Sequence, residues 1–302
     1  MELRQIKGNT WALEGIELIP LYKLDDHRCI LLDTGLAQEG EALLAALEAH
    51  GLTPAGVLCS HAHVDHAGNN RMLQQTFGLP VAMTPSEAGM CASLLTLKCY
   101  FLLLSPDTVA REAGHLVHRP DMIVPERDGV FSFLGVDFQI LYTPGHSAGH
   151  IAITTPDRVC YVGDALLSWE QMEAKLPYSL CHRMAKDSRE RLRQVDCDLL
   201  LMAHRGVISR DGLDALIDAN DALIQRRAGE ILELVTRPMT VSEISQAVCA
   251  KYKLLTSKPT RALRFERNIR FYLEYLIDHG DLTMETESGI AMYHLSSGAQ
   301  ES

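Results

Sequence analysis

The sequence of 302 residues contains no uninterrupted apolar run near the roughly 18 residues that a membrane-spanning helix needs. Its first residues, MELRQIKGNTWALEG, also lack the basic stretch followed by an apolar stretch that marks a secretion signal. These absences argue against a membrane protein and against export. We therefore expect a cytoplasmic protein, and its length allows one large domain or a large and a small one.

A cysteine framework is missing as well. Eight cysteines are present, but no two of them form a CxxC pair. This excludes a zinc knuckle and gives no sign of a disulfide scaffold in a chain of this size. We expect reduced thiols, most of them buried.

The sequence also lacks an excess of basic charge. The formal net charge is −11, and residues 1–224 carry all of it, with 18 lysines and arginines against 29 aspartates and glutamates. Residues 225–302 are neutral, with ten residues of each sign. Because a strongly acidic body repels a phosphate backbone, nucleic acid is not expected to be the principal partner. We expect no membrane partner either.

What the sequence does contain is a regular alternation of strand-like and helix-like segments. RCILLDTG, GVLCS and DLLLMAH read as strands, whereas EGEALLAALEAHG has helical periodicity. Such alternation predicts a layered α/β domain. From about residue 225, three helical segments precede two short strands joined at Ser288-Gly289, which is a winged-helix plan. We therefore predict a main domain over 1–222 and a winged-helix-like domain over 225–302.

The segment SHAHVDHAGN, residues 60–69, places three histidines and an aspartate within six positions. Residues two apart on an extended segment point the same way, so His61 and His63 can hold one ion together. Asp65 and His66 follow and offer a further oxygen and nitrogen. Imidazole and carboxylate are typical ligands of divalent metals such as zinc.

One loop cannot complete two coordination spheres, so this reading requires distant partners. Three residues qualify, because each directly follows a strand-like run: His146 after FQILYTPG, Asp164 after VCYVG and His204 after LLLMA. Side chains at the ends of neighbouring strands converge on one rim of a sheet, where sites in α/β folds commonly lie. We therefore expect all seven side chains to meet.

With these residues, the sequence resembles the metallo-β-lactamase superfamily over about residues 5–220. The matching segments are LLDTG, SHAHVDHAGN, TPGHSAGH, YVGDAL and LLLMAHRG. The resemblance implies a four-layer αββα sandwich. The implied metal ligands are, for a first ion, His61, His63 and His146, for a second ion, Asp65, His66 and His204, and between the two ions, Asp164.

Within that superfamily the pattern looks like glyoxalase II and related thioesterases. Common zinc lactamases have cysteine where this chain has Asp164, which disfavours antibiotic hydrolysis. Two ions roughly 3.5–4 Å apart would share a bridging water and make it a hydroxide near pH 7. Asp65 would orient this nucleophile and accept its proton, which makes it the expected catalytic residue. Zinc suits the ligand set, and iron and manganese are alternatives.

Two neighbouring residues receive supporting roles. Asp33, in the DTG turn, is expected to bond to a loop or to a ligand histidine. His150 follows TPGHSAG and is expected to pack against or support the ligands.

The substrate expected from this resemblance is a small molecule with an acyl group, such as an acyl-CoA or glutathione thioester. Two segments, GMCASLLTLKCYFLLL and SWEQMEAKLPYSLCHRMAK, could wall a pocket for the acyl chain, although the first is better explained as an ordinary core helix. Candidate contacts in or after the second segment are Trp169, Tyr178, His182 and, for an anionic group, Arg205.

The C-terminal region adds a row of basic residues on one predicted helix: Lys258, Arg261, Arg264, Arg267 and Arg270. The region resembles the tail of the β-lactamase-like protein 2 group, some of whose members cleave single-stranded RNA. Its neutral charge favours a cap or a homodimer contact over DNA binding. One or two arginines could also meet phosphates such as those of coenzyme A.

Three alternatives to a thioesterase stay open. A metal-dependent ribonuclease or phosphodiesterase of the same fold is the first, although the sequence lacks a strongly basic channel. A regulator with a vestigial metal site is the second, and the presence of all seven ligand types argues against it. The third resembles persulfide dioxygenases, which use a single iron and need only part of this ligand set.

Overall fold

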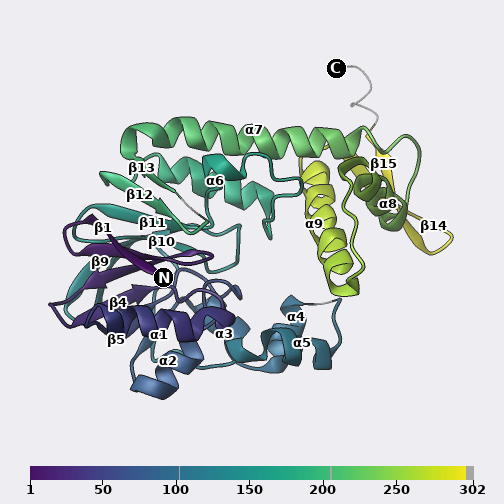
Figure 1. Cartoon of the computed structure of the whole chain (residues 1–302). Coiled ribbons are helices and arrows are strands. Elements are labelled where there is room, and N and C mark those ends of the chain that lie inside the picture. The colour runs from purple at the N-terminus through teal and green to yellow at the C-terminus, as the bar shows by residue number, and fades with distance from the viewer. Residues whose placement is uncertain (102, 205, 297–302) are drawn as a thin grey trace.

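The computed structural model describes residues 1–101, 103–204 and 206–296. Two β-sheets form its centre (Figure 1). The first sheet contains, in order across it, β1 (Glu2–Lys7), β2 (Thr10–Glu14), β3 (Leu18–Lys23), β4 (Arg28–Leu32), β5 (Thr53–Leu58), β6 (Val81–Met83) and β7 (Met122–Ile123). The second contains β13 (Val207–Ser209), β12 (Leu199–Met202), β11 (Val159–Gly163), β10 (Ile151–Thr154), β9 (Val136–Tyr142) and β8 (Gly129–Phe133).

Helices cover the outer face of each sheet (Figure 1). On the side of the first sheet lie α1 (Gly40–Ala49), α2 (Asn70–Phe77), α3 (Pro85–Cys91), α4 (Leu94–Tyr100) and α5 (Pro106–Ala113). On the side of the second lie α6 (His182–Leu192) and α7 (Leu213–Leu232). Short 3-10 helices span Ala37–Glu39, Gly114–Leu116, Trp169–Gln171 and Arg210–Gly212.

The strands alternate their side chains between the two faces of each sheet, as the pleat requires. In β10, Ile151 and Ile153 enter the core between the sheets, whereas Ala152 joins the core beneath α6 and α7. In β4, Ile30 likewise faces the other sheet and Leu31 faces the helices on its own side. The result is a helix–sheet–sheet–helix sandwich, which confirms the predicted α/β, four-layer αββα fold class.

The segment expected as one apolar helix over 89–104 is divided into α3 and α4. The first helix ends at Cys91. Ser93 starts the second, because its hydroxyl accepts the backbone N–H of Thr96 in a capping box. This break turns the α4 region towards the C-terminal part of the chain (Figure 1).

The C-terminal part contains α8 (Val241–Tyr252), α9 (Pro259–Asp278) and the antiparallel pair β14 (Leu282–Glu287) and β15 (Ile290–Leu295). Their order is the predicted one, but the predicted boundary near residue 222–225 falls inside the continuous helix α7. The first half of α7 packs on the second sheet through Leu216, and its second half packs with α9 through Ile231. One helix thus serves two cores, and the division into two domains stays a prediction.

The cysteine prediction is confirmed, because all eight are free thiols and five of them are buried. Among the described residues, no helix has both the length and the apolar character that crossing a bilayer requires.

Candidate metal centre

The predicted ligands lie on loops that follow the carboxyl ends of strands in both sheets. The 59–69 loop leaves β5, and separate loops or turns after β9, β11 and β12 carry His146, Asp164 and His204. The structure brings the side chains together in two clusters, within each of which the ligand atoms lie no more than 4.8 Å apart: His61, His63 and His146, and Asp65, His66, Asp164 and His204.

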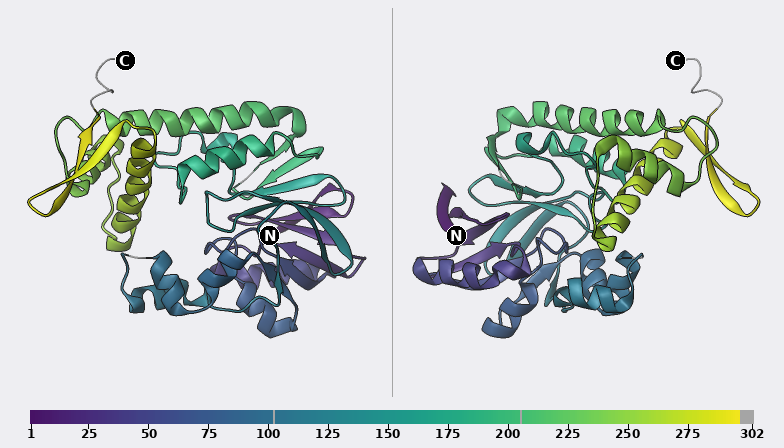
Figure 2. Two further views of the ribbon diagram at one scale, coloured as in Figure 1. Left: turned by 180° about the vertical axis from the view of Figure 1, so that it is seen from behind. Right: turned by 45° about the vertical axis from the view of Figure 1, so that its right-hand side comes forward.

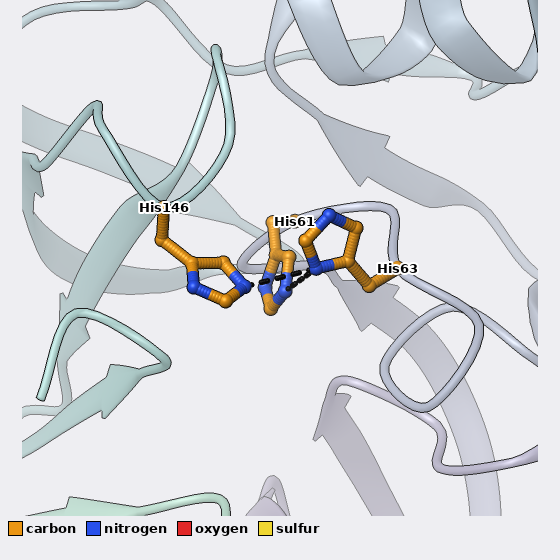
Figure 3. Close-up of side chains that lie close together, drawn as sticks. All are labelled: His61, His63 and His146. Atoms are coloured by element: carbon orange, nitrogen blue, oxygen red, sulfur yellow. Dashed lines mark hydrogen bonds between the residues drawn. The ribbon is translucent and has the colours of Figure 1, made fainter. Parts of the chain in front are cut away.

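In the first cluster, three imidazole nitrogens point towards one another (Figure 3). His63 Nδ1 lies 3.0 Å from His61 Nε2 and 2.9 Å from His146 Nε2. Burial lowers the pKa of His63 and His146 to about 3, so both rings are neutral at pH 7 and offer lone pairs. Three neutral imidazoles at these separations form a typical set of ligands for a divalent transition metal.

Asp164 lies between the two clusters. Its Oδ2 atom is 3.3 Å from His146 Nε2 of the first cluster and 3.2 Å from His204 Nε2 of the second. Its other oxygen, Oδ1, is 3.4 Å from His66 Nε2. Although burial raises the pKa of Asp164, the neighbouring His66 and His146 hold it well below its usual range, so it is ionised. One carboxylate therefore faces donors of both clusters.

The second cluster combines two carboxylates with two imidazoles. Asp65 Oδ2 lies 3.7 Å from His204 Nε2 and 4.0 Å from His66 Nε2. Burial lowers the pKa of His204, but hydrogen bonds to Asp164 and Glu17 outweigh it and raise that pKa to about 10. A cation entering this cluster would replace protons on the rings.

Buried polar atoms without partners show how well a metal fits. Among the described residues, His66 Nε2 and Asp164 Oδ1 are buried and make no hydrogen bond. An unpaired buried donor or acceptor is costly, and a divalent cation between these atoms would satisfy both. The donor types and the unpaired atoms together fit a centre that binds divalent cations.

Asp33 supports the loop that carries the first ligands. Its Oδ2 accepts hydrogen bonds from His66 Nδ1 at 2.8 Å, Tyr161 Oη at 2.6 Å and Ser60 Oγ at 2.5 Å, and its Oδ1 accepts the Ser60 backbone N–H at 2.6 Å. Ser60 Oγ also lies 3.0 Å from His61 Nδ1. Both histidines are thereby oriented with Nε2 towards the centre.

His150 holds the backbone of Asp164. The Asp164 backbone N–H donates to His150 Nε2 at 3.1 Å, so the hydrogen of this neutral ring is on Nδ1, 2.8 Å from Thr143 Oγ1. With both nitrogens occupied, His150 supports a ligand and is not one.

Three supporting residues carry no motif in the sequence. Buried Glu87 accepts the Ala62 N–H and the Gly149 N–H, each at 2.8 Å, and so ties the 59–69 loop to the loop around His146. Glu17 pairs with His204 Nδ1, and Tyr100 Oη hydrogen-bonds His63 Nε2. Each of these residues lies far along the chain from the residue it contacts and belongs to no spaced group of residues, so the sequence pattern could not indicate its role.

The predicted substrate contacts are divided by the structure. The ring of Tyr178 lies 5.1 Å from that of His146, at the border of the centre, whereas Trp169 is half exposed. His182 is buried at the start of α6, where the ring of Tyr272 of α9 lies 4.2 Å from its ring, so the structure does not bring it to the centre. Its contact with a substrate stays a prediction. Arg205 lies outside the described residues.

Comparison with known proteins places this geometry in a family. The model of the Metallo-beta-lactamase superfamily matches residues 19–204. The chain is 28% identical over 162 residues to a probable metallo-hydrolase, YqgX, of Bacillus subtilis (strain 168), covering 53% of this chain and 72% of that protein. It is 25% identical over 240 residues to a hydroxyacylglutathione hydrolase of Xanthomonas oryzae pv. oryzae, covering 78% and 79%.

Among solved structures, a beta-lactamase domain protein from Burkholderia ambifaria superposes with a TM-score of 0.71 at 19% identity, covering 98% of this chain and 94% of that one. At this identity the likeness shows the fold alone. It extends over the C-terminal part as well as the sandwich.

Proposed function

The chain belongs to the metallo-beta-lactamase superfamily and is a metal-dependent hydrolase, and from this premise we propose that it uses two divalent ions to cleave thioesters or small acyl esters. The observation that carries the proposal is Asp164, whose two oxygens face histidines of both clusters. A bridging carboxylate is the natural ligand for a pair of ions. The Xanthomonas relative, named a hydroxyacylglutathione hydrolase, supports an acyl substrate.

The two clusters divide the proposed ligands as the resemblance implied. His61, His63 and His146 would hold one ion, and Asp65, His66 and His204 the other, with Asp164 between them. Bound ions of this kind polarise a carbonyl oxygen and lower the pKa of water. The all-nitrogen and mixed sets suit zinc, and iron or manganese would accept the same donors.

Asp65 is the residue proposed to handle the proton. Its side chain is 25% exposed, more than that of Asp164 at 11%, so it faces the solvent side of the centre. There its Oδ2 can orient an attacking water and accept the proton that the water loses. Asp164, in contrast, faces three imidazoles with its two oxygens and is proposed to serve as a metal ligand.

Tyr100 and Tyr178 line the other side of the centre. Their hydroxyls lie 3.0 Å apart, and the Tyr100 hydroxyl also bonds His63 Nε2. The two rings would give an acyl group an aromatic surface to lie against.

A side-by-side substrate panel tests this proposal. Metal-loaded protein should hydrolyse acyl-CoA or glutathione thioesters at least about tenfold faster than a phosphodiester or single-stranded RNA, because the acidic body disfavours polyanions. Thioester hydrolysis is followed by detection of the released thiol, and cleavage of an aryl phosphodiester by the absorbance of the released phenolate. RNA cleavage is followed by gel electrophoresis. Chelator-treated protein is the control for contaminating activity. Cleavage of RNA alone would contradict the proposal and favour the nuclease alternative.

A further inference from the structure

A pocket of about 530 Å³ lies between the α4 region and α9. Figure 2 shows from two further sides that α9 stands against the α4 and α5 region. Arg264 of α9 fastens the two parts through an ion pair with Glu112 of α5 at 2.9 Å. Apolar side chains dominate the lining and come from both parts, among them Phe101, Leu104, Leu263 and Phe271. This volume is within the range of small-molecule sites.

The pocket lies beside the metal centre, and two tyrosines stand between them. Tyr100 and Tyr178 both line it, and the same two residues contact His63 and His146 of the first cluster. A molecule whose reacting group lies at the centre can therefore extend one arm past the tyrosines into the pocket.

Three arginines of α9 line the pocket, and two of them already have acidic partners. Arg264 pairs with Glu112, and Arg270 pairs with Glu266 at 2.8 Å. Arg267 differs, because no carboxylate of the described residues lies within ion-pair distance of its guanidinium. Its sole hydrogen bond there is a long one, 3.4 Å, to Asn268 Oδ1.

Arg267 is held in place by aromatic rings instead. Its guanidinium carbon lies 4.6 Å from the ring centre of Tyr178 and 5.7 Å from that of Tyr100. Its Nε atom is buried and makes no hydrogen bond to any residue that the structure describes. A stacked guanidinium with a buried, unpaired N–H is a preformed receptor for an oxyanion, since stacking fixes its plane without using its donors.

We propose that the pocket binds an apolar arm of the substrate that carries an oxyanion, carboxylate or phosphate, and that Arg267 pairs with this oxyanion. The inference rests on the proposed function, because it assigns the arm of the same substrate whose acyl bond lies at the metal centre. Leu263 and Phe271 would contact the apolar part, and Arg267 would select the charge. Glu274 also lines the pocket, but among the described residues it forms no ion pair with Arg267.

Binding of non-hydrolysable probes to the metal-loaded full chain tests the pocket. Octanoate and octyl phosphate should each bind about tenfold more tightly than octanamide in isothermal titration calorimetry, because only the first two offer a charged acceptor. Arg267→Gln should reduce this preference to about threefold or less. Arg261→Gln removes the same charge from an exposed position of the same helix and should keep the full preference.

The Arg267→Gln variant also distinguishes binding of the anionic probe in the pocket from binding at the metal ions, because metal ions bind carboxylates themselves and the substitution leaves them in place. A preference that is absent from the wild type, or unchanged in Arg267→Gln, would overturn the inference. Should the glutamine variant not fold, Arg267→Lys keeps the charge but not the planar fork, and its preference should fall about threefold. An undiminished preference in the lysine variant would count against the pocket equally.

Hydrolysis of matched thioesters distinguishes this inference from the proposed function. Two pairs of thioesters are compared, and within each pair one member ends in a carboxylate and the other in an amide. In the first pair this end group is on the acyl arm, and in the second pair it is on the thiol arm. Anion-selective binding without hydrolysis of any thioester would contradict the proposed function and support the pocket. Hydrolysis without preference for the anionic member of either pair would support the function and contradict the pocket.

Discussion

Asp164→Ala is expected to lower kcat/KM by about 1000-fold or more, which corresponds to roughly 4 kcal/mol of transition-state stabilisation. The reason is the position of its two oxygens, which lie 3.2–3.4 Å from histidines of both clusters. Without this carboxylate the second cluster loses one of its two acids, and the two clusters lose the group between them. Steady-state kinetics on a thioester and metal analysis of the same sample measure the effect.

Two further variants, a second ligand substitution and a surface control, are measured beside Asp164→Ala. His63→Ala removes a nitrogen at the middle of the first cluster and is expected to abolish turnover as well. Asp218→Ala is the matched control, because its side chain is 72% exposed and pairs with Arg193 on the surface. Circular dichroism should show that all three variants stay folded. Unchanged turnover in Asp164→Ala would remove this residue from the site.

Asp33→Ala is expected to reduce the free energy of unfolding by about 3–5 kcal/mol. The carboxylate of Asp33 is 2% exposed and accepts four hydrogen bonds, one of them from His66 Nδ1. Alanine would leave these buried donors without an acceptor. It would also have to adopt the left-handed backbone of Asp33, at φ +70°, which disfavours alanine. Urea denaturation of the metal-free protein measures the change.

The same substitution should weaken metal binding by about 10–100-fold, because His66 would lose the bond that aims Nε2 at the centre. Asp33→Asn is the graded control. The amide keeps one oxygen, and asparagine tolerates the backbone, so it should lose less stability than alanine. An alanine variant as stable as the wild type, with unchanged metal affinity, would show that Asp33 does not organise the centre.

The seven proposed ligands were predictable because each follows a strand. A loop that follows a strand places its side chains at one rim of the sheet, and this does not depend on the details of the packing. Histidine and aspartate at such positions indicate metal ligands. The four-layer fold was predictable for a related reason, since alternation along strands such as β10 marks which residues face each layer.

Two supporting residues, Asp33 and His150, stand next to motifs and were predicted. Glu17, Glu87 and Tyr100 were not, because their roles depend on contacts that no spacing encodes. Glu87 reaches the 59–69 loop only once α3 has packed beside it, and Glu17 meets His204 only after the two sheets have closed. The sequence suggests His182 as a substrate contact because it lies in the segment that follows Asp164 and could wall a pocket. The helix that begins at His182 turns its ring under α9 instead.

The boundary near residue 225 illustrates a different limit. The change in composition there is real, because Leu216 and Ile231 of α7 belong to different cores. A helix, however, continues as long as its backbone hydrogen bonds do, and nothing in α7 interrupts them. The change in composition therefore shows where the chain passes from one core to the other, but it does not show that a single helix continues across that point.

Metal content per chain is the most direct measurement of the central claim, that seven dispersed donors converge on a pair of cations. After expression in metal-replete medium and removal of loosely bound ions, mass spectrometry of the elements should find about two transition-metal ions per chain. Asp164→Ala should contain fewer. One ion or none in the wild type, even after incubation with saturating zinc, iron or manganese salts, would contradict the account.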